Sequence, residues 1–228
     1  RAWRSALDCD PRDPETITAL ARLAWIGGRT ATADELLGRA LRIAPDLDEA
    51  RHLAARLDFS AQRWADAVRR AATLARELRE QSAREAREFE AVETPGGEAG
   101  EARRLAGYWQ MLALLARRRG GLPDEPGDAA VDPALGEHWP APLWRHLLGR
   151  PDEARLVAAL QAEPDPARRR EMGCEALYYT AQQSFASGDA EAARRRLARV
   201  LNLKVLHFVE HDLALAELAA RRASPGSG

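Results

Sequence analysis

The sequence predicts an all-α fold in which helical hairpins stack as a solenoid, with an irregular middle and a C-terminal capping helix. The apolar residues are mainly Ala and Leu and the charged ones mainly Arg, Glu and Asp, a composition typical of helices. Residues 1–79 repeat with a period of 34 residues. Residues 174–218 have the pattern of a helix, a tight turn, a second helix and, after a short break, a third.

The period becomes visible when residues 1–11 are aligned with residues 35–45. The same shift of 34 residues pairs identical or similar side chains further on: Glu15 with Glu49, Arg22 with Arg56, and Trp25 with Phe59. A period of 34 residues is the signature of tetratricopeptide repeats, in which each repeat is a pair of antiparallel helices. The N-terminal part therefore resembles tetratricopeptide repeats. We expect the first repeat to be partial and the chain to be a fragment of a longer protein.

The helix that begins near residue 64 is expected to run on to residue 92, past the length that the repeat predicts. Arg and Glu recur in its second half at spacings of three and four residues, which is typical of an exposed helix. We expect this helix to project into solvent; a dimer contact is the alternative. This helix is the last element of the first predicted unit, residues 1–92.

The second predicted unit, residues 93–222, begins with irregular helices. The spacing predicts a helix over 101–119, with one apolar face made of Leu105, Tyr108, Trp109, Leu112 and Leu115. A loop rich in Gly, Pro and Asp follows, then a short helix over 143–148 and a further helix capped by Asp152. Trp109, Trp139 and Trp144 are expected to anchor this region as core residues. Residues 223–228 are predicted to be a disordered tail.

The C-terminal hairpin is the clearest local pattern. Leu177, Ala181 and Phe185 recur every four residues on one face of its first helix. The segment 187–189, Ser-Gly-Asp, is the predicted turn, because glycine accepts the left-handed backbone that ends a helix and aspartate caps the next one. The second helix presents a matching face: Ala193, Leu197 and Val200. The capping helix is expected over residues 208–218.

The second half of the chain also resembles a family of bacterial tetratricopeptide lipoproteins, the NlpI type. The resemblance covers about residues 105–218 and is most specific in the string F-V-E-H-x-x-A-L-x-E-L. The residues that carry it are Tyr108, Trp109, Trp139, Pro140, Leu148, Gly149, Tyr178, Gly188, Asp189, Phe208, Val209, Glu210, His211, Ala214, Glu217 and Leu218. It implies a homodimeric, outer-membrane-anchored adaptor that brings periplasmic proteases and cell-wall hydrolases together. We do not expect Cys9 to stand in for the lipidated N-terminal cysteine of that family, because Cys9 lies within a predicted helix.

One chemical motif stands in the same region. His207, Glu210 and His211 match H-x-x-E-H, a zinc-protease pattern in which two histidines bind the metal and the glutamate serves as base. The apolar pattern predicts that the helix starts near His207. We therefore expect His207 to lie on the turn that precedes the helix. Glu210 is expected to support the first turn of the helix, and His211 to pack against the hairpin. A zinc hydrolase is therefore the weaker alternative.

A peptide-binding groove is the other candidate site. Residues at equivalent repeat positions lie three, four and three residues apart, so each set forms one stripe on its helix. In a tetratricopeptide solenoid this stripe lines the concave surface, where an aromatic ring beside an arginine can hold an extended peptide. The alternative is that the aromatic residues pack within the repeats. The predicted stripe consists of Glu15, Thr18, Arg22, Trp25, Glu49, His52, Arg56, Phe59, Tyr178 and Gln182.

Composition and motifs argue against several classes of function. The formal net charge is −1, with no basic segment of the kind that nucleic-acid binders carry. The two cysteines, Cys9 and Cys174, are far apart in sequence, so neither a disulfide framework nor a zinc site is predicted. No apolar run reaches membrane-spanning length, and no phosphate loop, nucleophile elbow or cofactor motif is present.

We therefore expect a non-enzymatic scaffold or adaptor that binds a protein or peptide partner and needs no cofactor. By resemblance it is periplasmic or outer-membrane-associated. The alternative is a regulatory tetratricopeptide domain of a larger cytoplasmic protein or enzyme.

Overall fold

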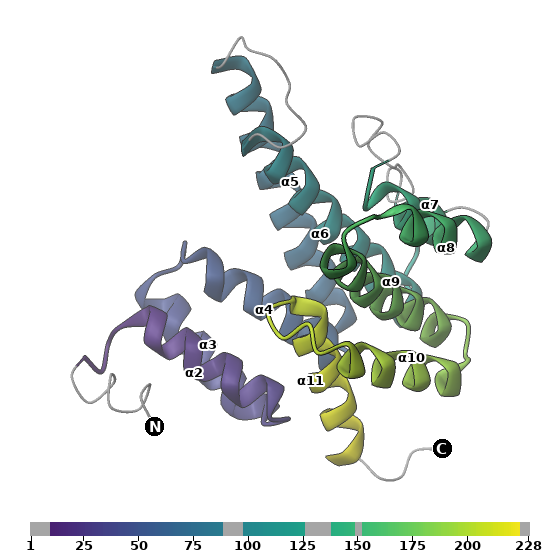
Figure 1. Cartoon of the computed structure of the whole chain (residues 1–228). Helices are drawn as coiled ribbons and strands as arrows, with labels where there is room; N and C mark the ends of the chain where they lie inside the picture. The colour runs from purple at the N-terminus through teal and green to yellow at the C-terminus, as the bar shows by residue number, and fades with distance from the viewer. Residues whose placement is uncertain (1–9, 89–97, 126–137, 149–151, 224–228) are drawn as a thin grey trace.

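The structure, a computed structural model, describes residues 10–88, 98–125, 138–148 and 152–223. This part of the chain is built from α-helices and contains no strand, so the all-α prediction is confirmed for it (Figure 1). The helices are α2 (Pro14–Ile26), α3 (Thr30–Ile43), α4 (Asp48–Ser60), α5 (Trp64–Glu88), α6 (Glu98–Gly120), α7 (Ala141–Leu148), α8 (Glu153–Ala162), α9 (Pro166–Ala186), α10 (Ala190–Leu203) and α11 (Val209–Ala223).

The period of 34 residues is present in the helix boundaries. Helices α2 and α4 begin at Pro14 and Asp48, and helices α3 and α5 begin at Thr30 and Trp64. Both pairs of starting points are separated by that period. The aligned N-terminal segment 1–9 lies outside the described residues.

Three hairpins, α2–α3, α4–α5 and α9–α10, use the same turn. Each turn contains one residue with a left-handed backbone: Gly28 (φ 74°), Gln62 (φ 61°) and Gly188 (φ 84°). The amide of the next residue donates to a carbonyl five residues back, and the N···O distance is 2.9 Å in all three turns. These bonds satisfy carbonyls that the end of a helix leaves without a partner.

Alanines at equivalent positions bring the two helices of each hairpin together. Ala21, Ala55 and Ala181 lie in the first helices, and Ala33, Ala67 and Ala193 in the second. All six side chains are fully buried. Their small size lets the helix backbones approach closely while larger neighbours such as Leu37 and Leu197 fill the remaining space. The apolar face predicted for α10 is confirmed, because Ala193, Leu197 and Val200 are all buried.

The expectation that the long helix projects alone into solvent is wrong. Helix α5 packs along α6 in antiparallel orientation, and Figure 1 shows the pair extending together beyond the neighbouring helices. A Cβ atom added to Gly120, at the end of α6, would lie 2.6 Å from Cβ of Trp64, at the start of α5. Further along, Arg79 donates a hydrogen bond to Gln110. The charged residues of α5 form pairs within the helix, such as Arg76 with Glu80, and pairs with α4, such as Arg70 with Asp58.

The middle of the chain packs around α6 and α9. Helix α7 places the indole of Trp144 against Gly107 of α6, and helices α7 and α8 both contact α9. Trp109 and Trp144 are buried as predicted, whereas Trp139 is half-buried. Leu105 departs from the prediction: 37% of the residue is exposed, because it borders a pocket described below.

Helix α11 lies between the N-terminal hairpins and the α9–α10 hairpin (Figure 1). It contacts α2, α4, α9 and α10, so it fills the space expected to be a concave groove. Ala219 of α11 reaches the turn at Gly28, where an added Cβ would lie 3.1 Å from its methyl group. The hydrophobic core is therefore continuous from α2 to α11. Residue 223, which was expected in the disordered tail, is the last residue of α11. Residues 224–228 of the predicted tail lie outside the described residues.

Candidate functional site

Five of the ten stripe residues are buried instead of lining an open groove: Thr18, Trp25, Phe59, Tyr178 and Gln182. Trp25 donates its indole N–H to Ser60 at 2.7 Å, which holds two neighbouring helices together. Tyr178 and Gln182 donate to Glu217 of α11 at 3.1 and 2.7 Å. These five positions are therefore not accessible to a peptide in this structure, and at Tyr178 and Gln182 it is α11 that occupies the space.

The other stripe residues lie at two different places. Glu15, Glu49 and Arg22 are exposed and border a second cavity of about 310 Å³ at α2 and the start of α4. Arg22 is already engaged, since it forms an ion pair with Asp212 of α11 at 2.6 Å. His52 packs against Trp109 with ring centroids 5.1 Å apart, and burial lowers its pKa to about 4. Arg56 lines a different cavity, the central pocket.

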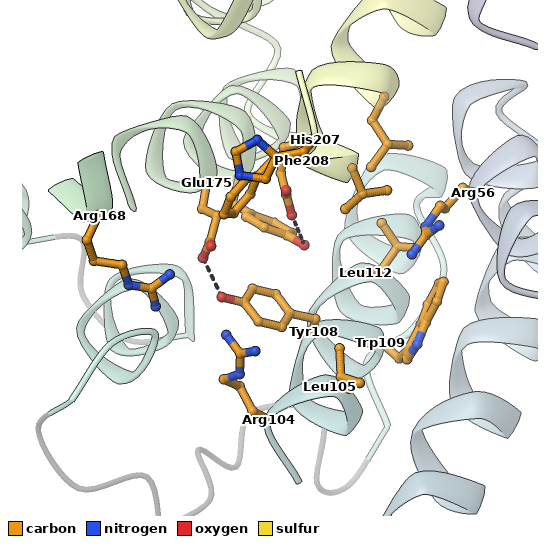
Figure 2. Close-up of a pocket in the computed structure, with 14 residues that line it drawn as sticks. Arg56, Arg104, Leu105, Tyr108, Trp109, Leu112, Arg168, Glu175, His207 and Phe208 are labelled. Atoms are coloured by element: carbon orange, nitrogen blue, oxygen red, sulfur yellow. Dashed lines mark hydrogen bonds between the residues drawn. The ribbon is translucent and has the colours of Figure 1, made fainter. Parts of the chain in front are cut away.

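The central pocket has a volume of about 300 Å³ and lies where α4, α6, α9, the 204–208 connection and α11 meet (Figure 2). One part of its wall is apolar: Leu105, Trp109, Leu112, Phe208, Val209 and Leu213. The other part is polar or charged: Arg56, Arg104, Tyr108, Arg168, Glu175, Tyr179, His207 and Glu210. Leu105 and His207 are exposed, which places them at the opening.

Helix periodicity brings these side chains together. On α6, residues 104, 105, 108, 109 and 112 recur at spacings of three and four and therefore share a face. On α9, residues 168, 175 and 179 are close to whole turns apart, and on α11 residues 209, 210 and 213 form the first turn facing the pocket. The pocket is thus built on rigid helices.

Glu175 is held by two donors. Its Oε2 accepts a hydrogen bond from the indole N–H of Trp139 at 2.7 Å and another from the hydroxyl of Tyr108, which Figure 2 shows as a dashed line. The residue is 3% exposed. Burial raises the pKa of this carboxyl, and the hydrogen bonds from Tyr108 and Trp139 oppose that rise.

Glu210 has one carboxyl oxygen in the pocket without a hydrogen-bond partner among the described residues. The residue is 2% exposed, and its Oε1 accepts a hydrogen bond from the hydroxyl of Tyr179 at 3.3 Å. Its buried Oε2 has no hydrogen-bond partner among the described residues. Burial first, and then the charge of Glu175, raise the pKa of Glu210 to about 8. The raised pKa favours the protonated form of this carboxyl, which can donate a hydrogen bond.

Three arginines face the same cavity. Arg104 pairs with Glu101 at 2.6 Å, and Arg168 pairs with Glu171 at 3.2 Å. The guanidinium of Arg56 lies 5.2 Å from the ring centroid of Trp109 and makes no hydrogen bond or ion pair within the described part of the chain. Burial lowers the pKa of Arg56, and the neighbouring Glu210 opposes that effect.

The H-x-x-E-H string does not assemble as a metal site. His207 precedes α11 and its Nε2 lies 3.2 Å from Glu171, while Glu210 points into the central pocket and His211 is buried. No group of three His, Cys, Asp or Glu side chains within the described ranges is arranged to hold a metal ion. Glu210 does lie in the first turn of α11, as expected.

Comparison of the sequence with models of known protein families and with curated proteins gives no match. The resemblance to the NlpI type therefore stays a prediction. Within the described part of the chain, no helix combines the length and the apolar character needed to cross a bilayer.

Sequence reasoning missed most of the central pocket. Arg104, Tyr108, Arg168 and Tyr179 were not expected to act together, and Glu175 is not among the residues of the predicted stripe. A signal existed on α6, where Arg104 and the hydroxyl of Tyr108 stand on or beside the predicted apolar face. The meeting of that face with α9 and α11 depends on contacts between distant segments, which periodicity does not reveal.

Proposed function

We propose that this chain is a non-enzymatic scaffold or adaptor that binds a segment of a partner protein in the central pocket. The observation that carries the proposal is a pair of groups in an open cavity: the buried Oε2 atom of Glu210, which has no hydrogen-bond partner among the described residues, and the half-buried guanidinium of Arg56, which forms no ion pair among them. A buried polar atom without a partner is costly, so its presence in a cavity beside a guanidinium favours a ligand that hydrogen-bonds to both. The apolar wall beside them favours a ligand with an apolar side chain.

The framework supports a binding role. Residues of the wall come from α4, α6, α9 and α11, so a ligand there contacts both the 34-residue hairpins and the C-terminal hairpin. The resemblance to NlpI-type proteins favours the same class and adds an adaptor role at a bacterial envelope, periplasmic or outer-membrane-associated, with a homodimer as the working form. These finer points are part of the proposal.

A pair of matched substitutions tests it. Leu105→Glu places a charge at the opening of the pocket. Val157→Glu places one at an exposed apolar position of α8 that is not part of the pocket wall; the two residues are 37% and 42% exposed. Immobilised wild type and both variants are incubated with extract of the source cell, and retained proteins are identified by mass spectrometry. We expect specific proteins on the wild type and on Val157→Glu that are lost on Leu105→Glu.

Two other outcomes would count against the proposal. Equal retention by all three forms would show that partners bind elsewhere on the surface. Retention of no protein by the wild type would contradict the scaffold role and favour a regulatory domain that acts within its own larger chain.

A further inference from the structure

We infer that the central pocket binds the C-terminal residue of a polypeptide, with the free carboxylate at Arg56 and Glu210 and an apolar side chain against the leucines of the wall. This inference rests on the proposed function and specifies its ligand. It follows from the charge of the wall, the state of Glu210, the size of the cavity and the groups at its opening.

The charge of the wall favours a carboxylate. Three guanidinium groups face the cavity, and Arg56 has no anionic partner of its own within the described residues. A planar guanidinium pairs with a carboxylate through two parallel hydrogen bonds, which are stronger than bonds between neutral groups. Glu175 does not compete for a ligand, since Trp139 and Tyr108 already donate to it.

Glu210 contributes as a donor. The groups that face it come from each neighbouring helix: Arg56 of α4, Tyr108 of α6, and Cys174, Glu175 and Tyr179 of α9, with His211 and Asp212 beside it on α11. The hydroxyl of Tyr179 occupies Oε1, so a proton on Oε2 is free to bond to a ligand oxygen. If Glu210 loses this proton, its charge repels a carboxylate. Binding should therefore weaken as the pH rises through the pKa of Glu210, about 8.

The size of the cavity decides how much of a chain it holds. A volume of about 300 Å³ is at the small end of ligand pockets, which span about 300–1,000 Å³. It suits one terminal residue better than a long acyl chain or an extended segment. Leu112, Trp109 and Leu213 supply the apolar contact for its side chain. At the opening, Arg104, Arg168 and His207 can donate to the backbone carbonyls of the residues that precede it.

Isothermal titration calorimetry on the full chain tests this with four probes. They are N-acetyl-Gly-Ser-Ala-Leu with a free carboxylate, the same peptide as a C-terminal amide, N-acetyl-Gly-Ser-Ala-Asp with a free carboxylate, and octanoate. At pH 6.5 we expect the first peptide to bind on the order of tenfold more tightly than its amide, because charged hydrogen bonds are lost in the amide. The peptide ending in Asp and octanoate should both bind more weakly.

The pH dependence separates Glu210 from other titrating groups. Between pH 6.5 and 9, the affinity of the wild type for the first peptide should fall several-fold. In Glu210→Gln, which has a similar shape and no titrating proton, the affinity should no longer change with pH. His207→Gln, at the opening, should keep the wild-type dependence. Arg56→Met should lose the preference for the carboxylate over the amide, and Leu105→Glu should weaken all peptide binding.

Contrary results are distinct from a failure of the proposed function. Equal affinity for carboxylate and amide would overturn carboxylate recognition, and octanoate binding as tightly as the peptide would overturn a polypeptide ligand. No peptide binding, together with pocket-dependent retention of partner proteins, would overturn the inference alone. A pH dependence that persists in Glu210→Gln would overturn the part assigned to Glu210.

Discussion

Arg119 of α6 donates a hydrogen bond to Glu217 of α11 at 2.8 Å, and the two side chains are only 4% and 2% exposed. The ion pair joins the middle of the chain to its C-terminal helix. Arg119 also lies over the rings of Phe59, Trp64 and Phe185 at 4.5–5.4 Å from their centroids. This one guanidinium therefore contacts residues of α4, α5 and α9 as well as α11.

Glu217→Gln should lower the free energy of unfolding by about 3–5 kcal/mol, because it leaves the charge of Arg119 buried without a counter-ion. Urea unfolding followed by circular dichroism measures the change. Asp212→Asn is the matched control, since it removes a second ion pair of α11; Asp212 is 8% exposed, but the charge that remains, on Arg22, is 47% exposed. Solvent screens that pair, so we expect a loss of about 1 kcal/mol or less. Equal losses in the two variants would show that burial does not govern the strength of these pairs.

Gly107→Ala should destabilise the contact between α6 and α7. A Cβ at Gly107 would lie 1.5 Å from Cη2 of Trp144, which is far inside van der Waals contact with a rigid, buried ring. Forcing extra volume into a packed core typically costs about 1–3 kcal/mol. Gly38→Ala on α3 is the control, because its nearest neighbour would be the flexible end of Arg42 at 3.5 Å. It should be neutral or slightly stabilising. The melting temperatures of both variants check this prediction.

Gln62→Gly should stabilise the protein by roughly 0.5–1 kcal/mol. Gln62 has a left-handed backbone, φ 61°, at the turn position that glycine occupies in the other two hairpins. A residue with a Cβ pays about 1–2 kcal/mol in this conformation, and the greater freedom of glycine in the unfolded chain cancels part of the gain. Gly188→Ala should have the opposite sign. Chemical unfolding of both variants tests the assignment of a common turn.

The stability should fall as the pH rises from 6.5 to 8, because Glu210 keeps a proton in the native state that the unfolded chain has already released. The native pKa of Glu210 is about 8 and its ordinary value is 4.5, so the native state binds more protons between these pH values. His52 acts in the opposite direction between pH 4 and 6.5, since burial lowers its pKa to about 4. The two effects oppose each other below pH 6.5. Above it Glu210 acts in the same direction as Glu175, whose pKa burial also raises.

The expected slope between pH 6.5 and 8 is on the order of 1 kcal/mol per pH unit. Urea unfolding at a series of pH values measures it, and Glu210→Gln is the control because its stability should be nearly constant in this range. A wild-type slope that persists in Glu210→Gln would show that another group is responsible.

Much of the local structure could be predicted from the sequence. The turn at residues 187–189, the cap at Asp152 and the buried face of α10 depend on neighbours within a few residues, and each was found where expected. On the face predicted for α9 only Ala181 is buried, whereas Leu177 and Phe185 are half-buried. The long helix was misjudged because the charges of α5 say which side faces solvent, but not whether the other side has a partner. Leu105 was misassigned for a related reason: its face of α6 is apolar, yet it ends at a cavity.

The sequence by itself determined the helical hairpins and their period of 34 residues, because turn chemistry and helix periodicity act between residues close in the chain. Only the tertiary structure decided that α11 fills the groove and that a pocket remains beside it. The bonds that place α11 join residues far apart: Arg22 with Asp212, 190 residues later, and Arg119 with Glu217, 98 residues later. Stripe residues such as Tyr178 carry the same local pattern whether a peptide or α11 covers them, so their burial depends on long-range packing alone.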